Sequence, residues 1–465
     1  MEVLAIVLSL VGLMYFAYRG FNVILFAPVF ALLAAAFSGW DVMPAYTELF
    51  MIKMVSYIKS FFPLFMLGAV FGKIMDATGA AKAIAHWIVG KLGPSRAIIS
   101  VVLSCAILTY GGVSLFVVAF AVYPLAAAIF REGNIPKRLI PASIALGSFT
   151  FTMTALPGSP QIQNAIPIKY FGTTTWAAPA TGILAALIML IGGLTWLEYR
   201  RKKAMAAGEG YGNHTKQEPE KKIDETPLPS ALFAILPLAV VLVLNFFLSR
   251  SIPTWDNAMM NQVTALKLPL AVTSVKAAAG NWALIISLVT GIVAALALMY
   301  KQIKGKIAQS TNDGTIGSLL AVMNTASEVG YGNVISSLAG FSVISGALAG
   351  LKANPLFAEA VSVNLLAGIT GSASGGMSIA LETMGKQFLE WANAANISPE
   401  VLHRIASISS GGFDTMPHNG AVITLFAITG LTHKESYIDL MIVSLVIPVL
   451  SGLVGILWYM ATGIA

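Results

Sequence analysis

The chain has 465 residues, of which 57% are hydrophobic and only 11% are charged, and its mean hydropathy of +0.79 excludes an ordinary soluble globular protein. Its apolar runs reach the roughly 17 to 25 residues that a helix needs to cross a bilayer, which predicts an all-α polytopic membrane protein and not a barrel of short strands. The net charge of +7 arises from short basic clusters beside these runs, a placement typical of membrane orientation signals and not of a nucleic-acid surface.

The first half of the chain opens with apolar spans and amphipathic stretches. The predicted spans cover residues 3–18, 21–37 and 61–75. Residues 46–60, before the third span, are amphipathic and are expected to lie along the membrane interface, whereas residues 80–92 are too polar to cross.

A re-entrant hairpin is predicted next. The apolar run 98–130 is split by Thr109-Tyr-Gly-Gly-Val-Ser114 into two arms, each short for a full crossing. Arg96 and Arg131 flank the run, and the positive-inside tendency places both in the cytoplasm. A hairpin that enters from the cytoplasm and turns at Gly111-Gly112 fits both observations.

The following helix is interrupted. Residues 139–153 are apolar, but Thr154 to Asn164 introduces prolines, a glycine and polar side chains. A span over 176–197 then ends at the basic cluster 200–203, which is expected inside. The hydrophilic residues 200–230 are predicted to be a flexible cytoplasmic linker between a first repeat, 1–199, and a second repeat, 231–465.

The second half shows the same order of elements. Its predicted parts are spans at 231–248 and 282–300, a third span at 316–326 with a glycine-rich stretch at 330–350, a split run at 357–388, a broken helix at 401–430 and a final span at 437–462. The second interruption is Asp414-Thr-Met-Pro-His-Asn-Gly420. Because non-helical backbone survives at membrane depth only inside protein or beside a watery cavity, the two breaks are predicted to form the floor of a binding site.

Short motifs recur between the halves at offsets of 260 to 264 residues, which indicates an internal repeat. Gly111-Gly-Val-Ser114 recurs as Gly375-Gly-Met-Ser378, and Phe71-Gly72 recurs as Tyr331-Gly332. Since a hairpin does not cross, each repeat is predicted to contain five crossing helices, a re-entrant hairpin and a discontinuous helix. An odd number of crossings inverts the second repeat, so both termini are expected outside. Inverted halves with discontinuous helices are typical of secondary transporters.

Substrate-binding residues are expected at the hairpin tips and the breaks. Free amide groups at the start of a helix, together with the positive end of its dipole, suit a carboxylate. Close helix packing is the alternative explanation for the Gly-Gly and Ser residues. The predicted substrate-binding residues are Tyr110, Gly111, Gly112, Ser114, Thr154, Ser159, Gln161, Ser372, Ser374, Gly375, Gly376, Ser378, Thr415, His418 and Asn419.

Three ionisable side chains are predicted to carry the coupling charge, because ionisable residues inside membrane segments are costly and usually functional. Asp414 and His418 lie four residues apart around Pro417, and both side chains can take up and release a proton. Glu328 is a further relay carboxyl. The alternatives are an N-cap for Asp414 and a helix-end cap for His418.

No cofactor and no resident metal are expected. The histidines lack metal-site spacing with support from Cys or Glu, and the chain has no Walker-type glycine loop for ATP. The expected partners are a small organic anion, the lipid bilayer and a co-transported proton or sodium ion, but no nucleic acid.

At these motifs the chain resembles the gluconate:proton symporter family of bacterial inner membranes, within the larger ion transporter superfamily. The likeness covers nearly the whole length and is strongest at residues 68–79, at Tyr110 to Ser114, at the Pro157 break and at 409–433. The resemblance implies paired inverted repeats, frequent assembly as a homodimer, and uptake of hydroxylated organic acids with protons.

The departures from this family concern the substrate. Gluconate-type members tend to have a His-Pro-rich first break and a glutamate after the tip tyrosine, where this chain has Pro157-Gly-Ser-Pro160 and Gly111. The run Asp414 to Asn419 is more similar to the 3-hydroxybutyrate-type permease branch. A site with fewer polar groups suits a short hydroxy- or keto-monocarboxylate such as 3-hydroxybutyrate, with gluconate as the family's own alternative.

The sequence therefore predicts a secondary active symporter for a small organic anion, driven by protons, with sodium as the alternative cation. Two other classes were weighed against it. A passive anion channel would conduct without accumulating its solute. An intramembrane enzyme using Asp414 and His418 would need more polar residues around them than the sequence offers, so the chain is not predicted to be an enzyme.

Overall fold

The computed structural model describes residues 2–19, 21–214, 216–218, 228–267, 272–341, 343, 354–417 and 419–465. Within these ranges every regular element is a helix and none is a strand, so the all-α prediction is confirmed. The elements of the first half are α1 (Glu2–Tyr18), α2 (Val23–Phe37), α3 (Val42–Pro44), η1 (Ala45–Phe50), α4 (Met51–Ala77), α5 (Ala80–Leu92), η2 (Pro94–Arg96), α6 (Ala97–Tyr110), α7 (Leu115–Glu132), η3 (Lys137–Leu139), α8 (Ile140–Ser148), α9 (Phe151–Thr154), α10 (Ile162–Phe171) and α11 (Pro179–Ala206).

The second half is also entirely helical in its described residues. Its elements are α12 (Ala231–Ser251), η4 (Ile252–Thr254), η5 (Asn257–Met260), α13 (Asn261–Ala265), α14 (Val275–Leu298), α15 (Tyr300–Ile303), α16 (Ile307–Ser337), α18 (Pro355–Thr370), α19 (Ala373–Ala394), α20 (Pro399–Ser410), η6 (Phe413–Thr415), α21 (Gly420–Thr429), α22 (His433–Met441), η7 (Ile442–Val446) and α23 (Ile447–Thr462).

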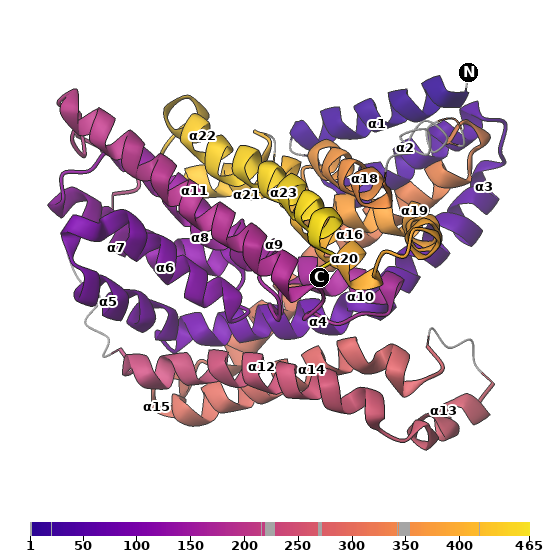
Figure 1. Cartoon of the computed structure of the whole chain (residues 1–465), viewed down its shortest axis with the longest axis horizontal. Coiled ribbons are helices and arrows are strands. Elements are labelled where there is room, and N and C mark those ends of the chain that lie inside the picture. Colours follow the sequence, from indigo (N-terminus) through magenta and orange to yellow (C-terminus); the bar gives the residue numbers. More distant parts are fainter. Residues whose placement is uncertain are drawn as a thin grey trace.

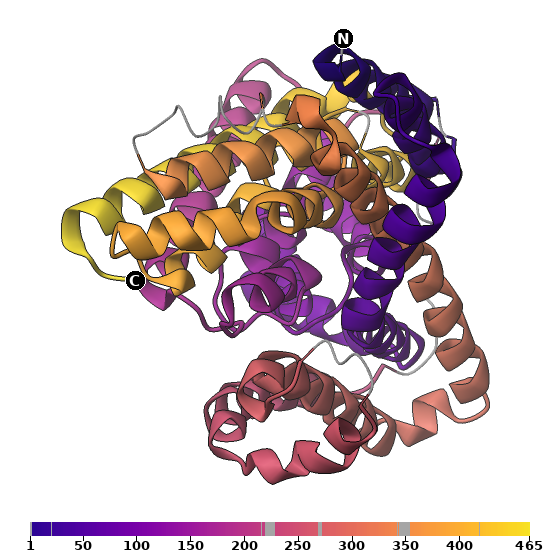
Figure 2. The same ribbon diagram turned by 90° about the vertical axis from the view of Figure 1, so that its right-hand side faces the viewer.

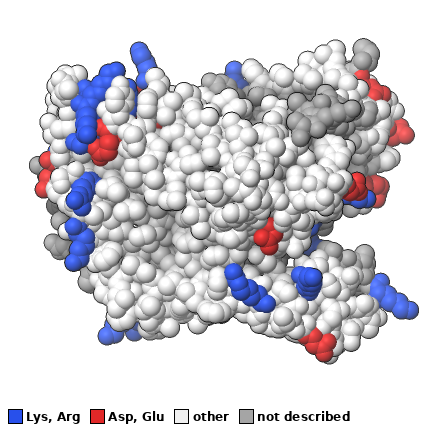
Figure 3. Space-filling model, viewed as in Figure 1, with Lys and Arg blue, Asp and Glu red and all other residues white. Residues whose placement is uncertain are grey.

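Several helices have the length and composition of membrane spans. Five qualify among the described residues, and a sixth is added if the pair Ala80–Leu92 and Pro94–Tyr110, bent by 107°, forms one span. Shorter apolar helices, among them Val23–Phe37 and Pro355–Thr370, pack beside them. Figure 3 shows a broad face with few charged side chains in its middle, and Lys and Arg gathered along its left edge.

The two halves are interlocked through their third long helices. Helices α4 and α16 pack along one another in the most extensive helix pair of the described structure. The pair α1 and α2 packs on α16 of the other half, whereas the pair α12 and α14 packs on α4 and α5 (Figure 1). Figure 2 shows α12 and α14 as a separate layer beneath the rest. Each half therefore stabilises the other.

Both predicted helix breaks are confirmed, because α9 ends at Thr154 before α10 begins at Ile162, and α20 ends at Ser410 before α21 begins at Gly420. Both split apolar runs also form helix pairs, α6 with α7 and α18 with α19. The direction of the two repeats relative to a membrane, and the count of five crossings in each, stay predictions.

The prediction that residues 46–60 lie along the membrane interface is wrong. These residues belong to a continuous helical segment, Val42–Ala77, that is long and apolar enough to span a membrane. Met54, Tyr57, Phe61 and Leu64 are all buried and recur every three or four residues, so one apolar face continues without a break through the stretch. The polar residue Lys53 pairs with Glu382 of α19, with 3.4 Å between Nζ and Oε1.

The boundary expected at residue 200 also shifts. Helix α11 continues to Ala206, and residues 207–218 pack against the body of the protein in the part of the linker that the structure describes. Residues 215 and 219–227 of the predicted linker lie outside the described residues.

Helix packing in the second hairpin depends on a glycine. A Cβ added to Gly376 of α19 would overlap the backbone N and Cα of Ala367 in α18, and backbone atoms cannot move aside cheaply. We expect Gly376→Ala to destabilise the protein by about 1 to 3 kcal/mol, measured by thermal unfolding in detergent. Gly90→Ala in α5 is the matched control, because no atom lies within 4 Å of its added Cβ. Equal unfolding of the two variants would contradict the assignment.

Candidate functional site

The first break is held open by side chains that satisfy its backbone. Ser159 Oγ donates to the carbonyl of Thr152 at 2.9 Å, and Asn164 Nδ2 donates to the carbonyls of Ser159 and Thr175 at 2.8 and 2.9 Å. Ser159 and Asn164 are fully buried. These bonds explain how non-helical backbone persists inside an apolar protein.

The second break is built in the same way. Thr415 Oγ1 contacts the carbonyls of Gly412 and Ser444, each at 3.2 Å, and Tyr437 donates its hydroxyl to the carbonyl of Thr415 at 3.1 Å. Asp414 is 5% exposed, and its Oδ1 has no hydrogen-bond partner among the described residues. His418, the predicted partner of Asp414, lies outside the described residues.

An amide side chain ties each break to the tip of its own hairpin. Gln161 Nε2 donates to the carbonyls of Thr109 and Val113 at 2.7 and 3.2 Å, and Asn419 Nδ2 donates to the carbonyl of Gly371 at 2.7 Å. Gln161 and Asn419 both occupy the N-cap position of a ten-residue helix, α10 and α21 respectively. Both helices end at a glycine in the left-handed conformation. The two halves thus share one local design.

The two breaks also contact each other. Ser407 Oγ of α20 donates to the carbonyl of Thr154 at 2.7 Å, and a Cβ added to Gly411 would lie 2.6 Å from Thr154 Cγ2. Tyr110 joins the first tip to the first break, because its hydroxyl donates to the carbonyl of Pro157 at 2.8 Å. The structure therefore brings the predicted tip and break residues of each half together, and the two halves meet at Thr154.

The second hairpin tip differs from the expectation. The turn lies at Gly371 and Ser372, so Gly375 and Gly376 belong to the first turn of α19 and not to the tip itself. In the first half Gly111 and Gly112 do form the turn, and Gly112 has a φ of 103°. Sequence matching aligned the two Gly-Gly pairs because they are identical, whereas the hydrogen-bonded turn in the second half needs only one left-handed glycine, Gly371.

The hydroxyl groups proposed as substrate donors have protein partners. Ser378 Oγ lies 3.4 Å from the hydroxyl of Tyr57 on α4, and Ser374 Oγ lies 3.4 Å from Thr325 Oγ1 on α16. Ser372 Oγ caps α19 by accepting from the amide of Gly375 at 3.0 Å. Ser114, at the start of α7, makes no such capping bond. The first tip thus keeps more free hydrogen-bonding capacity than the second.

A buried arginine beside the first break was missed by sequence reasoning. Arg404 of α20 is fully buried, and its guanidinium donates to Asn164 Oδ1 at 2.9 Å and to the carbonyls of Thr175 and Ala177 at 3.0 and 2.8 Å. The neighbouring His403 lies 2.6 Å from Thr173 Oγ1 and 3.2 Å from Asn164 Oδ1. Arg404 has no acidic partner within 4 Å among the described ion pairs, and its guanidinium is held by neutral oxygens. The sequence could have pointed to Arg404, because a charged residue inside a predicted membrane segment is costly and usually functional.

No family model matches the chain. A search of curated proteins finds the uncharacterized transporter YxjC of Bacillus subtilis (strain 168), which is 47% identical over 456 residues, covering 96% of each chain. This chain belongs to the YxjC family of transporters. An uncharacterized transporter of Haemophilus influenzae is 25% identical over 181 residues, covering 38% of this chain and 40% of its own. Membership of this family, together with the apolar helices, shows that the chain is a multi-pass membrane protein of the transporter class.

A solved structure resembles the fold of this chain. The YdaH transporter of Alcanivorax borkumensis, described as having an unusual topology, superposes with a TM-score of 0.56 over 88% of each chain, at 14% sequence identity. At this identity the likeness shows the shared helical architecture alone.

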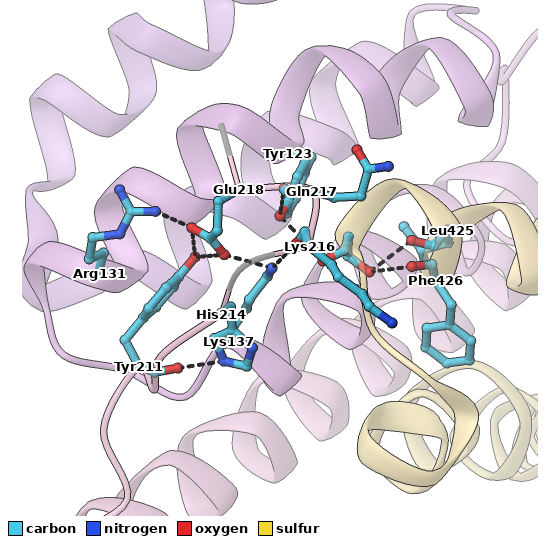
Figure 4. A network of polar contacts seen from close by, with 11 residues as sticks. Tyr123, Arg131, Lys137, Tyr211, His214, Lys216, Gln217, Glu218, Leu425 and Phe426 are labelled. Atoms are coloured by element: carbon cyan, nitrogen blue, oxygen red, sulfur yellow. Dashed lines mark hydrogen bonds and ion pairs between the residues drawn. The ribbon is translucent and has the colours of Figure 1, made fainter. Parts of the chain in front are cut away.

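Residues 211–214 and 216–218 form a strap that packs against the body of the protein near the end of α21. Glu218 pairs with Arg131 of α7 and with Lys137, whose Nζ lies 2.7 Å from Oε1, and the Tyr211 hydroxyl donates to the same carboxylate at 3.2 Å (Figure 4). Tyr123 donates its hydroxyl to the carbonyl of Gln217 at 2.6 Å. The strap thus fastens the first hairpin to the end of the second broken helix.

We expect Glu218→Gln to lower the free energy of unfolding by about 3 kcal/mol, because Lys137 is fully buried and would lose the ion pair that the described residues give it. The matched control is Glu209→Gln, which breaks a half-exposed pair with Arg138 and should cost at most about 1 kcal/mol. Thermal unfolding in detergent measures both. A Glu218→Gln loss no larger than that of the control would argue against the clamp.

The strap should also respond to acid. Burial alone would raise the pKa of Glu218, but the hydrogen bonds and charges of Lys137 and Arg131 outweigh it and lower the pKa below the ordinary 4.5. A lowered folded-state pKa gives stability that is present above pH 4.5 and is lost as the pH falls through the lower value. We expect the difference in unfolding midpoint between wild type and Glu218→Gln to shrink only below about pH 4.5. A difference that vanishes near neutral pH would contradict this assignment.

Proposed function

We propose that this transporter is a secondary symporter that imports a small organic anion together with protons. The observation that carries the proposal is the pair of helix breaks, which contact each other at Thr154 and are each tied by an amide to a hairpin tip. Unwound backbone inside the protein, opposite the start of a helix, is the usual setting of a substrate site in secondary transporters.

Three features of the site support an anionic substrate. Arg404 places a positive charge beside the first break, without an ion pair among the described residues. Helices α7 and α19 both begin at the hairpin tips, where the positive end of the helix dipole favours a carboxylate. Ser114 leaves the amides at the start of α7 without a side-chain cap, so they can be used by a ligand.

The substrate class is proposed to be a short hydroxy- or keto-monocarboxylate such as 3-hydroxybutyrate. The hydroxyls of Ser159 and Thr415 are engaged with the protein, which leaves few donors for a polyhydroxylated acid such as gluconate. The resemblance of Asp414 to Asn419 to the 3-hydroxybutyrate-type branch of the gluconate permease family points the same way. Coupling is assigned to a buried carboxyl group, either Asp414 with His418 or Glu328.

The proposed setting is a bacterial inner membrane. We place both termini outside and residues 200–230 in the cytoplasm, with the second repeat inverted relative to the first. Two observations are consistent with this arrangement. Each half packs its first helix pair on the long third helix of the other half, and Lys and Arg gather along the left edge of the face in Figure 3. A homodimer is proposed from the family resemblance. The chain is proposed to need no cofactor and to perform no enzymatic step.

Uptake by reconstituted protein tests the proposal. Proteoliposomes are given labelled 3-hydroxybutyrate, lactate or gluconate under an imposed pH gradient, a sodium gradient or neither. We expect the short acids to accumulate several-fold above equilibrium only with the pH gradient, and gluconate to accumulate less. Accumulation driven by sodium alone would favour the sodium symporter, and simple equilibration would indicate a channel. If none of the acids enters, the substrate class is wrong.

A further inference from the structure

The two hairpin tips face different chemistry on the neighbouring long helix. In the second half, Glu328 of α16 projects onto the first turn of α19. A Cβ added to Gly375 would overlap Glu328 Oε2, so the glycine makes the room that the carboxyl group occupies. Thr325, one turn earlier on α16, reaches Ser374 of the same turn. The carboxyl group is thus packed at the start of a hairpin helix.

Glu328 is buried without an ordinary partner. The residue is 4% exposed, and its Oε2 has no hydrogen-bond partner in the described structure. No ion pair between described residues involves it. The nearest favourable charge is the positive end of the α19 dipole, which acts on the carboxylate but not on the neutral acid.

None of the other titratable groups described near Glu328 acts as its counter-ion. Tyr57 of α4 faces it and contacts Ser378. Lys53 of α4 is directed to Glu382, which lies further along α19, and Lys59 is exposed. Lys73 and Asp76 lie at least 16 residues beyond Tyr57, about 24 Å along the helix. Glu48 of η1 is exposed, and α2 has no titratable side chain.

The first half has no carboxyl group at the corresponding place. The repeat aligns Glu328 with Gly68 of α4, whose added Cβ would have no atom within 4 Å. Gly72, one turn later, faces the amide of Ser114 at the start of α7, with 3.5 Å between its added Cβ and that nitrogen. Since the fold is maintained there without an acid, Glu328 is not a packing requirement of the repeat. The first tip is open to a carboxylate from outside the chain, whereas the second holds the protein's own.

Asp414 belongs to the second break itself. It lies in the short turn η6, where the backbone amides of Asp414 and Thr415 approach its carboxylate, and its Oδ1 has no hydrogen-bond partner among the described residues. Thr415 in turn is anchored to Ser444 of η7. Glu328, by contrast, lies on the long helix α16 and packs against the first turn of a hairpin helix, where Gly375 leaves room for its carboxyl group.

We propose that Glu328 is the group that carries the transported proton, and that the substrate carboxylate binds at the first hairpin tip. This inference rests on the proposed function and assigns its two charges to different tips. The ionised carboxylate holds the start of α19 against α16. Uptake of one proton from the outer solution by a carboxylate oxygen removes that attraction, and release of the same proton to the cytoplasm restores it. No bond other than the O–H bond forms or breaks.

The test separates proton-driven accumulation from substrate exchange. Glu328→Gln imitates the protonated acid, so we expect at least a tenfold loss of accumulation driven by a pH gradient, while exchange of labelled for unlabelled 3-hydroxybutyrate at equal pH persists. Glu328→Asp, which keeps a titratable group, should recover part of the accumulation. Glu359→Gln is the matched control, because Glu359 is also fully buried with no hydrogen-bond partner among the described residues, and it lies eleven residues before the end of α18 at the tip; it should keep the response.

Asp414→Asn completes the comparison, and we expect it to reduce exchange and accumulation by the same factor, because it alters the break and not the proton carrier. The inference is overturned if Glu328→Gln still accumulates substrate in response to pH, or if Asp414→Asn or Glu359→Gln shows the split between exchange and accumulation instead. Absence of any uptake by the wild type would reject the proposed function, which is a separate result.

A second variant covers the case in which Glu328→Gln does not fold. Gly375→Ala adds a methyl group where Oε2 lies, and the flexible carboxyl group must swing away from α19. We expect the same selective loss of pH-driven accumulation. Gly385→Ala in the same helix is the control, because its added Cβ meets only Tyr170 at 3.4 Å. Full pH-driven accumulation by Gly375→Ala would overturn the inference.

Discussion

The structure depends on satisfying backbone groups that two helix breaks release inside an apolar protein. Lipid cannot satisfy these groups, so each carbonyl and amide needs a partner within the chain or in a watery cavity. Ser159 and Asn164 supply partners at the first break, and Tyr437 supplies one at the second. Gln161 and Asn419 extend the same solution to the hairpin tips. The small polar residues that make the breaks visible in the sequence are therefore the residues that make them tolerable.

This requirement explains why the two halves are interlocked. A break cannot face lipid, so it has to be enclosed by helices from both repeats, and each half sends its first helix pair to the long third helix of the other. Contact between the breaks at Thr154 then becomes the centre of the molecule. Two buried basic side chains show how the protein stabilises a charge: Arg404 is held by hydrogen bonds to the first break, and Lys137 at the strap has a close acidic partner.

Two halves with similar backbones but different side chains can perform different tasks. The helices α10 and α21 have the same length, a residue with an amide side chain at the N-cap position and a left-handed glycine at the end. The long helices beside the tips differ, with Gly68 and Gly72 in one half and Glu328 in the other. An anion site and a proton site can therefore occupy equivalent positions without competing for the same groups.

The sequence by itself determined the membrane class, the all-helical fold, the two breaks and the two hairpins, because apolar length and the effects of proline and glycine act over a few neighbouring residues. It did not reveal that residues 46–60 continue a long helix, that Arg404 is fully buried, or that Glu328 meets Gly375. Each of these depends on which face of a helix is covered by another helix far away in the chain. Only the tertiary packing decides that, since the same polar side chain can face lipid, water or a buried partner without any change in its local sequence.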